Sequence, residues 1–453
     1  MVDCLYGNGA PGWQNGGFVA TMLHFVIART EARPDLRSPM STTHTTPLPD
    51  EGRVAHILRS PTRFVREILA GVITALALIP EVISFSVVAG VDPKVSLFAS
   101  VVLCLGLSVL GGRPAMVTAA AGSVALVIGP MVAQHGVQYI LPAVLLAGVI
   151  QILFGVLGMA RLMRFIPQAV MTGFVNALGI LIFFAQVPHF WSKSPLIVGL
   201  FVLTLLIVLW APRYIKSIPS PLIAIVLLTL FTVTSGQILP TVGDEGSMGG
   251  GLPGLTQLLV PLNLQTLSII WPCALSIAFV GLMESLLTAK LVDELTATPS
   301  SKRRESIGLG ITNILSGFYG GIAGCAMIGQ TIVNVEMGKG RSRVSTFAAG
   351  MVLLLLVTAL SEVMAKIPMA VLAGIMAIVA VKTFNWHSVQ PATVKGAPVA
   401  ETAVMLVTVA ATVSTGNLAI GVVGGIIAMA ILPARLKRKH SATAETASQA
   451  PEK

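Results

Sequence analysis

Long apolar runs, separated by short polar connections, fill most of the chain from about residue 64 onward. Each run approaches the roughly 20 residues that an α-helix needs to cross the hydrocarbon core of a bilayer, so the pattern predicts an all-α polytopic membrane protein. We identify fourteen apolar segments. The first seven cover about 66–91, 93–111, 115–132, 138–160, 165–189, 194–212 and 219–239; after a glycine-rich loop, the second seven cover about 265–291, 303–319, 322–337, 343–366, 368–385, 397–414 and 416–434.

The third and the tenth segments differ from the others because they are weakly hydrophobic and rich in small residues. In both, a glycine pair precedes a run of small side chains; the residues are Gly111, Gly112 and 119–123 in the third segment, and Gly320, Gly321 and 324–326 in the tenth. These are the third members of two sets of seven, and two sets with an odd number of spans cross the bilayer in opposite directions. The sequence therefore predicts a 7+7 inverted repeat, a common plan of transporters, with repeat 1 over about 64–240 and repeat 2 over about 262–435.

Lysine and arginine fall mainly on alternate connections. If the N-terminus is cytoplasmic, the connections after even-numbered segments and the C-terminal end face inward; they hold Arg113, Arg161, Arg164, Arg213, Lys216, Lys302, Arg303, Arg304, Lys339, Arg341, Arg343, Lys382, Lys395, Arg435, Lys437, Arg438 and Lys439. The outward connections hold Lys94, Lys193 and Lys366. Cytoplasmic loops of membrane proteins carry such an excess of positive charge. We therefore expect an integral protein of the cytoplasmic (inner) membrane with both termini in the cytoplasm.

The composition supports the same class of protein. Of the 453 residues, 54% are hydrophobic and 11% are charged, against about 25% charged in soluble domains, which argues against a disordered chain, a coiled coil or an ordinary cytosolic enzyme. The predicted topology accounts for the net charge of +10, so no nucleic-acid partner is expected. We predict a disordered leader over 1–60, a transmembrane domain over 61–435, and a basic tail over 436–453 that touches anionic lipid.

Cysteine and histidine add no chemistry to this picture. The 4 cysteines and 7 histidines lack the spacing of metal ligands, and no nucleophile–base pair is evident. We therefore predict no catalytic residue, no enzyme activity, no cofactor, and no metal site other than a bound sodium ion.

The small-residue runs in the third and tenth segments are candidate starts of half-helices. A helix that begins within the membrane presents unpaired N–H groups and the positive end of its dipole, and two that face each other form an anion site. The candidate anion-binding residues are Ala121, Gly122 and Ser123 in half-helix 3, and Cys325, Ala326 and Met327 in half-helix 10. The alternative is tight helix packing through small residues.

An acidic residue, Glu284, lies in the middle of the eighth segment, where a charge costs roughly 2.5–3.5 kcal/mol to insert. Thr288 follows four residues later on the same helical face. Together they offer oxygen ligands for a sodium ion, and Glu284 alone is suited to carry a proton. The alternative is a structural carboxyl group that bonds a neighbouring helix.

Two further polar residues are candidates for lining the same cavity. Glu81 follows Pro80 in the first segment, and a proline within a helix frees a backbone carbonyl; a structural position near a helix break fits Glu81 equally well. Gln330 lies in the tenth segment. The amides of Asn176, Gln186 and Asn313 fit interhelical hydrogen bonds better.

Several motifs, in order along the chain, resemble those of the SulP inorganic anion transporters (the sulfate permease family). The resemblance covers about 64–435. It is carried by 71–81 with 89–93 in the first segment, 173–177 in the fifth, 284–288 in the eighth, and 313–314 with 320–330 in the ninth and tenth.

The resemblance implies a 7+7 inverted repeat divided into core and gate domains, with the substrate between half-helices 3 and 10, in a homodimer. It implies substrates such as sulfate, bicarbonate and chloride. Glu284 and Thr288 match the positions that hold sodium in the sodium-dependent bicarbonate branch. Two departures stand out: the chain stops soon after the last segment, without the STAS domain of most members, and Ala121 aligns where the bicarbonate branch has a hydroxyl.

The favoured interpretation is a secondary active transporter of a small inorganic anion, sulfate or bicarbonate, coupled to sodium or protons, that works by alternating access. The alternatives are an uncoupled anion channel or exchanger and a nucleobase transporter of the same fold. A nucleobase carrier would be expected to pair carboxylates in segments 8 and 10, whereas segment 10 has Gln330 in mid-span and Glu336 only near its end.

Overall fold

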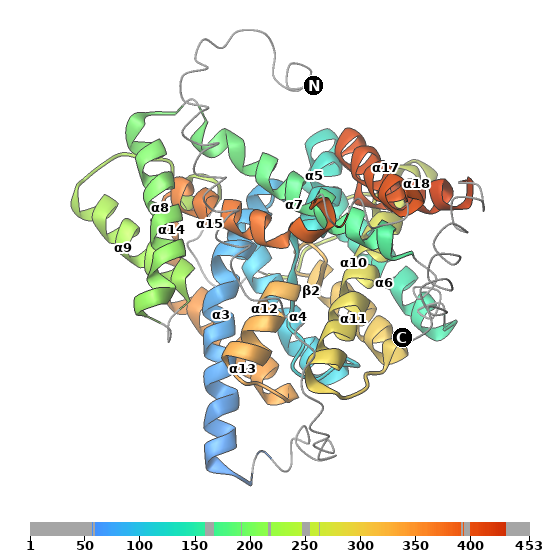
Figure 1. Cartoon of the computed structure of the whole chain (residues 1–453), viewed down its shortest axis with the longest axis horizontal. Coiled ribbons are helices and arrows are strands. Elements are labelled where there is room, and N and C mark those ends of the chain that lie inside the picture. The colour runs from blue at the N-terminus through green and yellow to red at the C-terminus, as the bar shows by residue number, and fades with distance from the viewer. Residues whose placement is uncertain are drawn as a thin grey trace, which may run out of the picture. The chain divides into compact units, whose positions relative to one another are not determined.

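The structure is a computed structural model that describes residues 57, 59–158, 167–191, 193–215, 219–246, 254–261, 263–390, 393 and 399–431. Nearly all of the predicted leader, 1–60, and the whole of the predicted tail, 436–453, lie outside the described residues. The described residues are largely helical (Figure 1).

Each of the fourteen predicted apolar ranges overlaps at least one helix. The first seven ranges overlap α3 (Pro61–Ala89), α4 (Pro93–Leu110), α5 (Gly122–His135), α6 (Ile140–Val156), α7 (Gln168–Phe190), α8 (Pro195–Tyr214) and α9 (Ser220–Thr234). The second seven overlap α10 (Leu264–Thr296), α11 (Lys302–Gly317), α12 (Ile328–Ile332) with the π-helix η5 (Val333–Met337), α13 (Arg343–Ala359) with α14 (Ser361–Ala365), α15 (Met369–Thr383), α17 (Val399–Thr415) and α18 (Leu418–Ile431).

Six described helices are long and apolar enough to cross a membrane, namely α3, α4, α6 with the turn before it, α7, α8 and α10. Shorter apolar helices, of 10–17 residues, include α9, α13, α15, α17 and α18. A polytopic helical membrane fold is therefore clear, while the number of spans and the inverted repeat stay predictions.

The expectation of an all-α fold needs one correction, because the chain also forms two short strands. β1 (Thr118–Ala120) and β2 (Gly324–Ala326) pair in an antiparallel register that sets Ala119 opposite Cys325. β1 leads into α5 and β2 leads into α12. The strands come from the two small-residue runs, so the third and tenth segments meet in a two-stranded ribbon.

The helices pack in two groups. The site group comprises α3 to α6, the two strands and α10 to α14, in which α6 packs on α11 and α10, and α13 packs on α3 and α4. The flanking group comprises α7, α8, α9, α15, α17 and α18, in which α7 packs on α15, α17 and α18, and α8 packs on α9. The groups meet where α3 contacts α15 and α9, where α10 contacts α18, and where α5 contacts α7.

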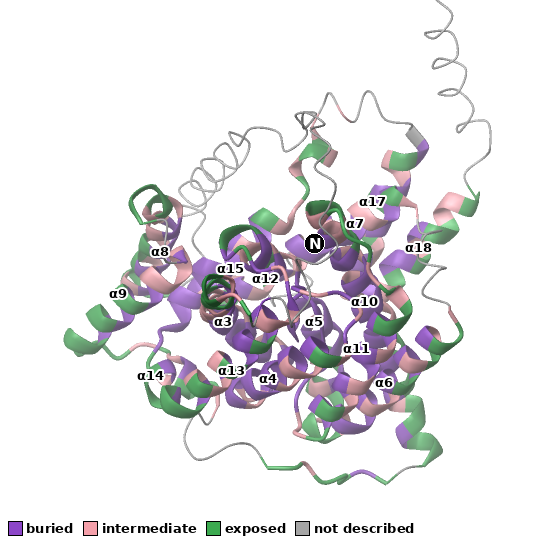
Figure 2. Ribbon diagram, turned by 90° about the horizontal axis from the view of Figure 1, so that it is seen from below, coloured by how far each residue is buried: buried purple, intermediate pink, exposed green. Residues whose placement is uncertain are grey.

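Large apolar side chains are exposed on the outer helices, which indicates a surface that faces lipid. In Figure 2 the exposed positions are prominent on α8 and α9, whereas α4 and α5 are mainly buried. The exposed apolar side chains on α8 and α9 include Leu203, Trp210, Val226, Leu230 and Phe231.

Basic residues from three of the predicted cytoplasmic connections lie together at one end of the site group. Arg113 donates to Asp293 over 3.0 Å, and Lys302 donates to the other oxygen of Asp293 over 2.8 Å. Arg304 and Arg343 donate to backbone carbonyls at the end of α4. Burial lowers the pKa of the Arg113 guanidinium from its ordinary value, and Asp293 opposes that shift. The three connections therefore share one side of the fold, as the topology map requires.

Candidate functional site

The two strand–helix junctions place two helix starts close together. α5 begins at Gly122 with Ala121 as its N-cap, as the sequence predicts. The other start falls later than predicted, because Cys325 and Ala326 belong to β2 and Met327 is the N-cap of α12. A strand rather than a helix forms there because both residues pair with the backbone or side chains of neighbouring elements.

The carboxylate of Glu284 lies where α5, β2 and α10 meet. The hydroxyl of Ser123 donates to Glu284 Oε2, and the thiol of Cys325 donates to the same oxygen over 3.1 Å. Ser123 Oγ and Cys325 Sγ are themselves 3.7 Å apart. Both donors are buried, while Glu284 is partly exposed. The structure therefore brings together residues predicted for the anion site and for the cation site.

Thr288 and Ser285 attach the end of β2 to α10. The Thr288 hydroxyl is 2.8 Å from the Glu284 carbonyl and 3.0 Å from the Ala326 carbonyl, and it donates to these oxygens. The Ala326 N–H donates to Ser285 Oγ over 3.0 Å. Carboxylate, hydroxyl and carbonyl oxygens, which hard cations prefer, thus lie next to one another. The role of Ser285 was not predicted from the sequence.

The outer edge of β1 is covered by two side chains of α4. The Ala120 N–H donates to Ser100 Oγ over 3.0 Å, and the Cys104 thiol donates to the Thr118 carbonyl over 3.0 Å. Unpaired backbone groups are costly where water is absent, and an open strand edge exposes a row of them. These side chains allow a short strand to exist within a helical membrane protein.

Asn313 covers the outer edge of β2 in the same way. Its Oδ1 accepts the Gly324 N–H over 2.8 Å, and its Nδ2 donates to the Gly324 carbonyl over 3.2 Å and to Gln151 Oε1 over 2.8 Å. The sequence pattern favours interhelical bonding for Asn313, whereas the role of Gln151 was not predicted. An amide in mid-span of the fourth apolar segment was the available signal.

The face of α3 that carries Glu81 lies over both helix starts. The Glu81 carboxylate accepts a hydrogen bond from the side chain of Gln330 on α12, which joins the two predicted cavity residues. One turn later on α3, the ring of Phe85 packs against Gly122 so closely that a Cβ at Gly122 would overlap it. Phe85 was not predicted from the sequence. Its signal was its position four residues after Glu81, on the same helical face.

Asn176 on α7 bonds another element, as expected. Its Oδ1 accepts the Asn385 N–H over 2.8 Å and its Nδ2 donates to Ser388 Oγ over 2.8 Å. Gln186, further along α7, is buried. Neither of these contacts of Asn176 involves the residues around Glu284.

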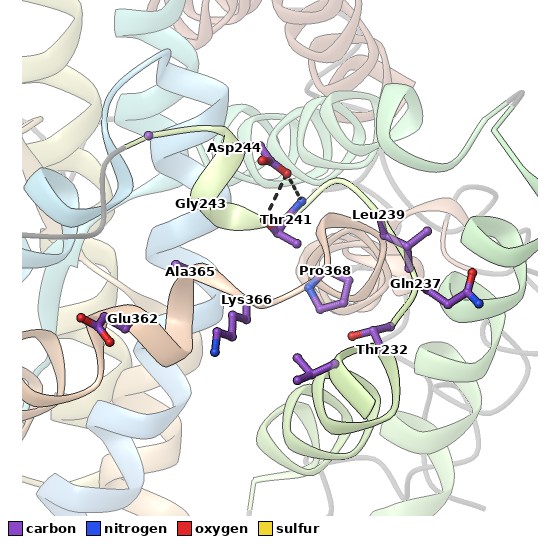
Figure 3. A pocket seen from close by; sticks show the side chains of 12 residues that line it. Thr232, Gln237, Leu239, Thr241, Gly243, Asp244, Glu362, Ala365, Lys366 and Pro368 are labelled. Carbon is purple, nitrogen blue, oxygen red and sulfur yellow. Dashed lines mark hydrogen bonds between the residues drawn. The ribbon is translucent and has the colours of Figure 1, made fainter. Parts of the chain in front are cut away.

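A cavity of about 570 Å³ lies elsewhere, between the loop that follows α9 and the short helix α14 (Figure 3). Charged side chains of Asp244, Glu362 and Lys366 line it, and Asp244 accepts two hydrogen bonds from Thr241. Its lining includes none of the residues around Glu284, so we do not include it in the candidate site.

Comparison with known proteins gives consistent matches over most of the chain. The model of the sulfate permease family matches residues 64–194 and 189–408. The chain is 48% identical to the putative sulfate transporter YbaR of Bacillus subtilis over 370 residues, which are 81% of this chain and 76% of that protein. It is 27% identical to the bicarbonate transporter BicA of Picosynechococcus over 425 residues, which are 85% of this chain and 73% of that protein.

Solved structures agree with these matches. The transmembrane domain of a cyanobacterial bicarbonate transporter BicA superposes with a TM-score of 0.69 at 25% identity, and the match covers 80% of this chain and 97% of that one.

Proposed function

Because the chain belongs to the sulfate permease family, we propose that it is a secondary active transporter of a small inorganic anion, sulfate or bicarbonate, driven by a cation gradient. The observation that carries the proposal is the position of Glu284 between two helix starts, with Ser123 and Cys325 on one of its oxygens. A carboxylate at that place is suited to act as a cation ligand or as a proton carrier.

The start of α5 would supply much of the attraction for the anion. The N–H groups of Gly122, Ser123 and Val124 lie in the first turn of the helix, where no intrahelical acceptor is available. Such groups, with the helix dipole, favour an anion without a lysine or arginine. Ala121 and the 325–327 run of the other junction complete the proposed anion-binding set.

The cation would bind beside the anion, between Glu284 and Thr288. The Thr288 hydroxyl uses its hydrogen on a carbonyl oxygen, so its lone pairs remain free for sodium. The Ala326 carbonyl lies within 3.0 Å of that hydroxyl and is a third oxygen ligand. A bound cation would offset the repulsion between Glu284 and the anion, and this couples the two binding events.

Alternating access follows from the two helix groups. In this proposal the site group is the core that carries both ligands, the flanking group is the gate, and the two belong to a 7+7 inverted repeat. Hydrogen bonds between different elements tie the site group together around both strands, which favours its motion as one body. We expect the working form to be a homodimer in the inner membrane.

Uptake of labelled sulfate and labelled bicarbonate into proteoliposomes tests the proposal. Each anion is offered with an inward sodium gradient, with an inward proton gradient, and with neither. The proposal predicts accumulation of one anion above its equilibrium level under one of the cation gradients. Flux that only follows the anion's own electrochemical gradient would indicate a channel or exchanger instead.

A further inference from the structure

A buried chain of two amide side chains connects α6 through α11 to β2. Gln151 on α6 accepts a hydrogen bond from Asn313 on α11, and Asn313 in turn bonds both backbone groups of Gly324. Gln151 and Asn313 are both fully buried. The next two residues of the strand, Cys325 and Ala326, are the ones that face Glu284 and Thr288.

Asn313 uses its full hydrogen-bonding capacity on these contacts. A side-chain amide has one acceptor oxygen and two N–H donors; the oxygen accepts from Gly324, one donor reaches the Gly324 carbonyl, and the other reaches Gln151. It therefore acts like a third strand at the edge of the ribbon. The backbone of Gly324 also touches β1, because a Cβ at this position would overlap the Ala119 carbonyl.

Gln151 is not satisfied to the same degree. Its Nε2 is buried and has no hydrogen-bond partner, which costs free energy and calls for an explanation. A Cβ added to Gly281 would lie 3.1 Å from that nitrogen, and Gly281 is one helical turn before Glu284 on α10. The Gln151 side chain thus lies between α10 and Asn313, in a position that serves the hydrogen bond to Asn313 and leaves Nε2 without a partner.

We propose that Gln151 and Asn313 are positioning residues of the transport site, which fix the height of β2 so that Cys325 and the Ala326 carbonyl meet Glu284 and Thr288. This inference rests on the proposed function for its transport readout, although the geometric part stands without it. In this proposal α6 and α11 do not contact the ligands, but their amide side chains influence the affinity for the cation.

The chain offers a matched control for a substitution of Asn313. Asn176 is also buried, and it also uses its amide on a backbone N–H and a second acceptor, but it does so in the flanking group. Asn313→Ala and Asn176→Ala therefore remove similar bonding from the two groups. Gln151→Met, which preserves volume while it removes the acceptor for Asn313, is a third variant.

The first readout is the rate at which N-ethylmaleimide alkylates Cys325 in the whole protein. Mass spectrometry of the resulting peptides measures the labelling of each cysteine. Cys273 on α10 is the internal reference because it is also buried. Asn313→Ala should raise the labelling rate of Cys325 relative to Cys273 about tenfold, since local opening of β2 becomes easier, and Gln151→Met should raise it less. Asn176→Ala should leave the ratio unchanged. An unchanged ratio in Asn313→Ala, or an equal rise in Asn176→Ala, would overturn the inference.

The second readout is the half-saturating cation concentration for anion uptake. Asn313→Ala should raise it about tenfold with a smaller change in the maximal rate, while Asn176→Ala leaves it unchanged. If labelling of Cys325 rises but the cation dependence does not, the two amides support packing alone and the positioning role is wrong. If the wild-type protein takes up neither anion, the proposed function fails, and the labelling result still decides whether the amides hold β2.

Discussion

The site group and the flanking group differ in how often their buried polar side chains bond a different element. In the site group such side chains link different elements: Ser285 bonds β2, Asn334 bonds the Ala115 carbonyl, and Thr331 bonds the Val117 N–H. In the flanking group, buried threonines such as Thr204 and Thr408 donate to a carbonyl of their own helix four residues earlier.

The difference shows what each region requires. A hydroxyl that bonds its own helix satisfies a polar group without attachment to a neighbour, and it leaves an apolar surface for packing. Hydrogen bonds between elements fix a unique geometry, as two short strands and two helix starts in a membrane require. Cross-element polar bonding is concentrated in the region where the ligands are expected, although Asn176 provides an example in the flanking group. The following substitutions compare the two groups.

The largest effect should follow from Glu284→Gln. The substitution keeps the shape of the side chain but removes the charge that a cation needs, so cation-driven uptake should fall about 100-fold. The measurement is initial uptake of the transported anion at a fixed cation gradient.

Glu362→Gln is the matched control, because Glu362 is exposed on α14 and lies outside the candidate site. It should transport at the wild-type rate. If Glu284→Gln transports as well as the wild type and with the same cation dependence, Glu284 is a structural carboxyl group and the coupling mechanism is wrong.

A smaller loss should follow from Thr288→Val. The valine has the same shape but removes one proposed cation ligand and leaves the Ala326 carbonyl without its donor, so the half-saturating cation concentration should rise about tenfold. The same substitution at Thr408 removes a hydroxyl that bonds only Val404 within α17. A similar shift in both variants would show that the two groups do not differ in this respect.

Replacing a glycine by alanine should have opposite effects on stability in the site group and in the flanking group, because the two glycines are packed differently. Gly122→Ala should lower the free energy of unfolding by at least about 1 kcal/mol, because the new Cβ overlaps the ring of Phe85. Gly199→Ala on α8 places its methyl in open space and should raise stability by roughly 0.5–1 kcal/mol, since alanine favours a helix over glycine. Thermal unfolding in detergent measures both; a stabilised Gly122→Ala would contradict the close contact between α3 and the start of α5.

The hydrophobic pattern was sufficient to predict the helices and one of the two helix starts. Each apolar range overlaps a described helix, because a bilayer imposes length and hydropathy on each span. The ranges of the third and tenth segments begin before α5 and α12, since β1 and β2 occupy residues there. The small-residue runs correctly indicated where α5 begins, since the close approach of backbones there excludes larger side chains.

The strands and the side-chain network were beyond the sequence pattern. β1 and β2 contain three residues each, too few for an alternation of polar and apolar positions, and they pair across about 200 residues of chain (Thr118 with Ala326). The hydrogen bond from the Cys325 thiol to Glu284 depends on that pairing. Gln151 and Ser285 carry no local motif, so only the tertiary contacts reveal their role.

The central claim is that a cation held by Glu284 and Thr288 helps to bind the anion at the helix starts. It is tested most directly by the dissociation constant of the transported anion for the purified protein, measured with and without sodium, in the wild type and in Glu284→Gln. We expect sodium to tighten anion binding about tenfold in the wild type and to have no effect in the variant. A dissociation constant that is independent of sodium in the wild type, or that depends on sodium equally in the variant, would contradict the claim.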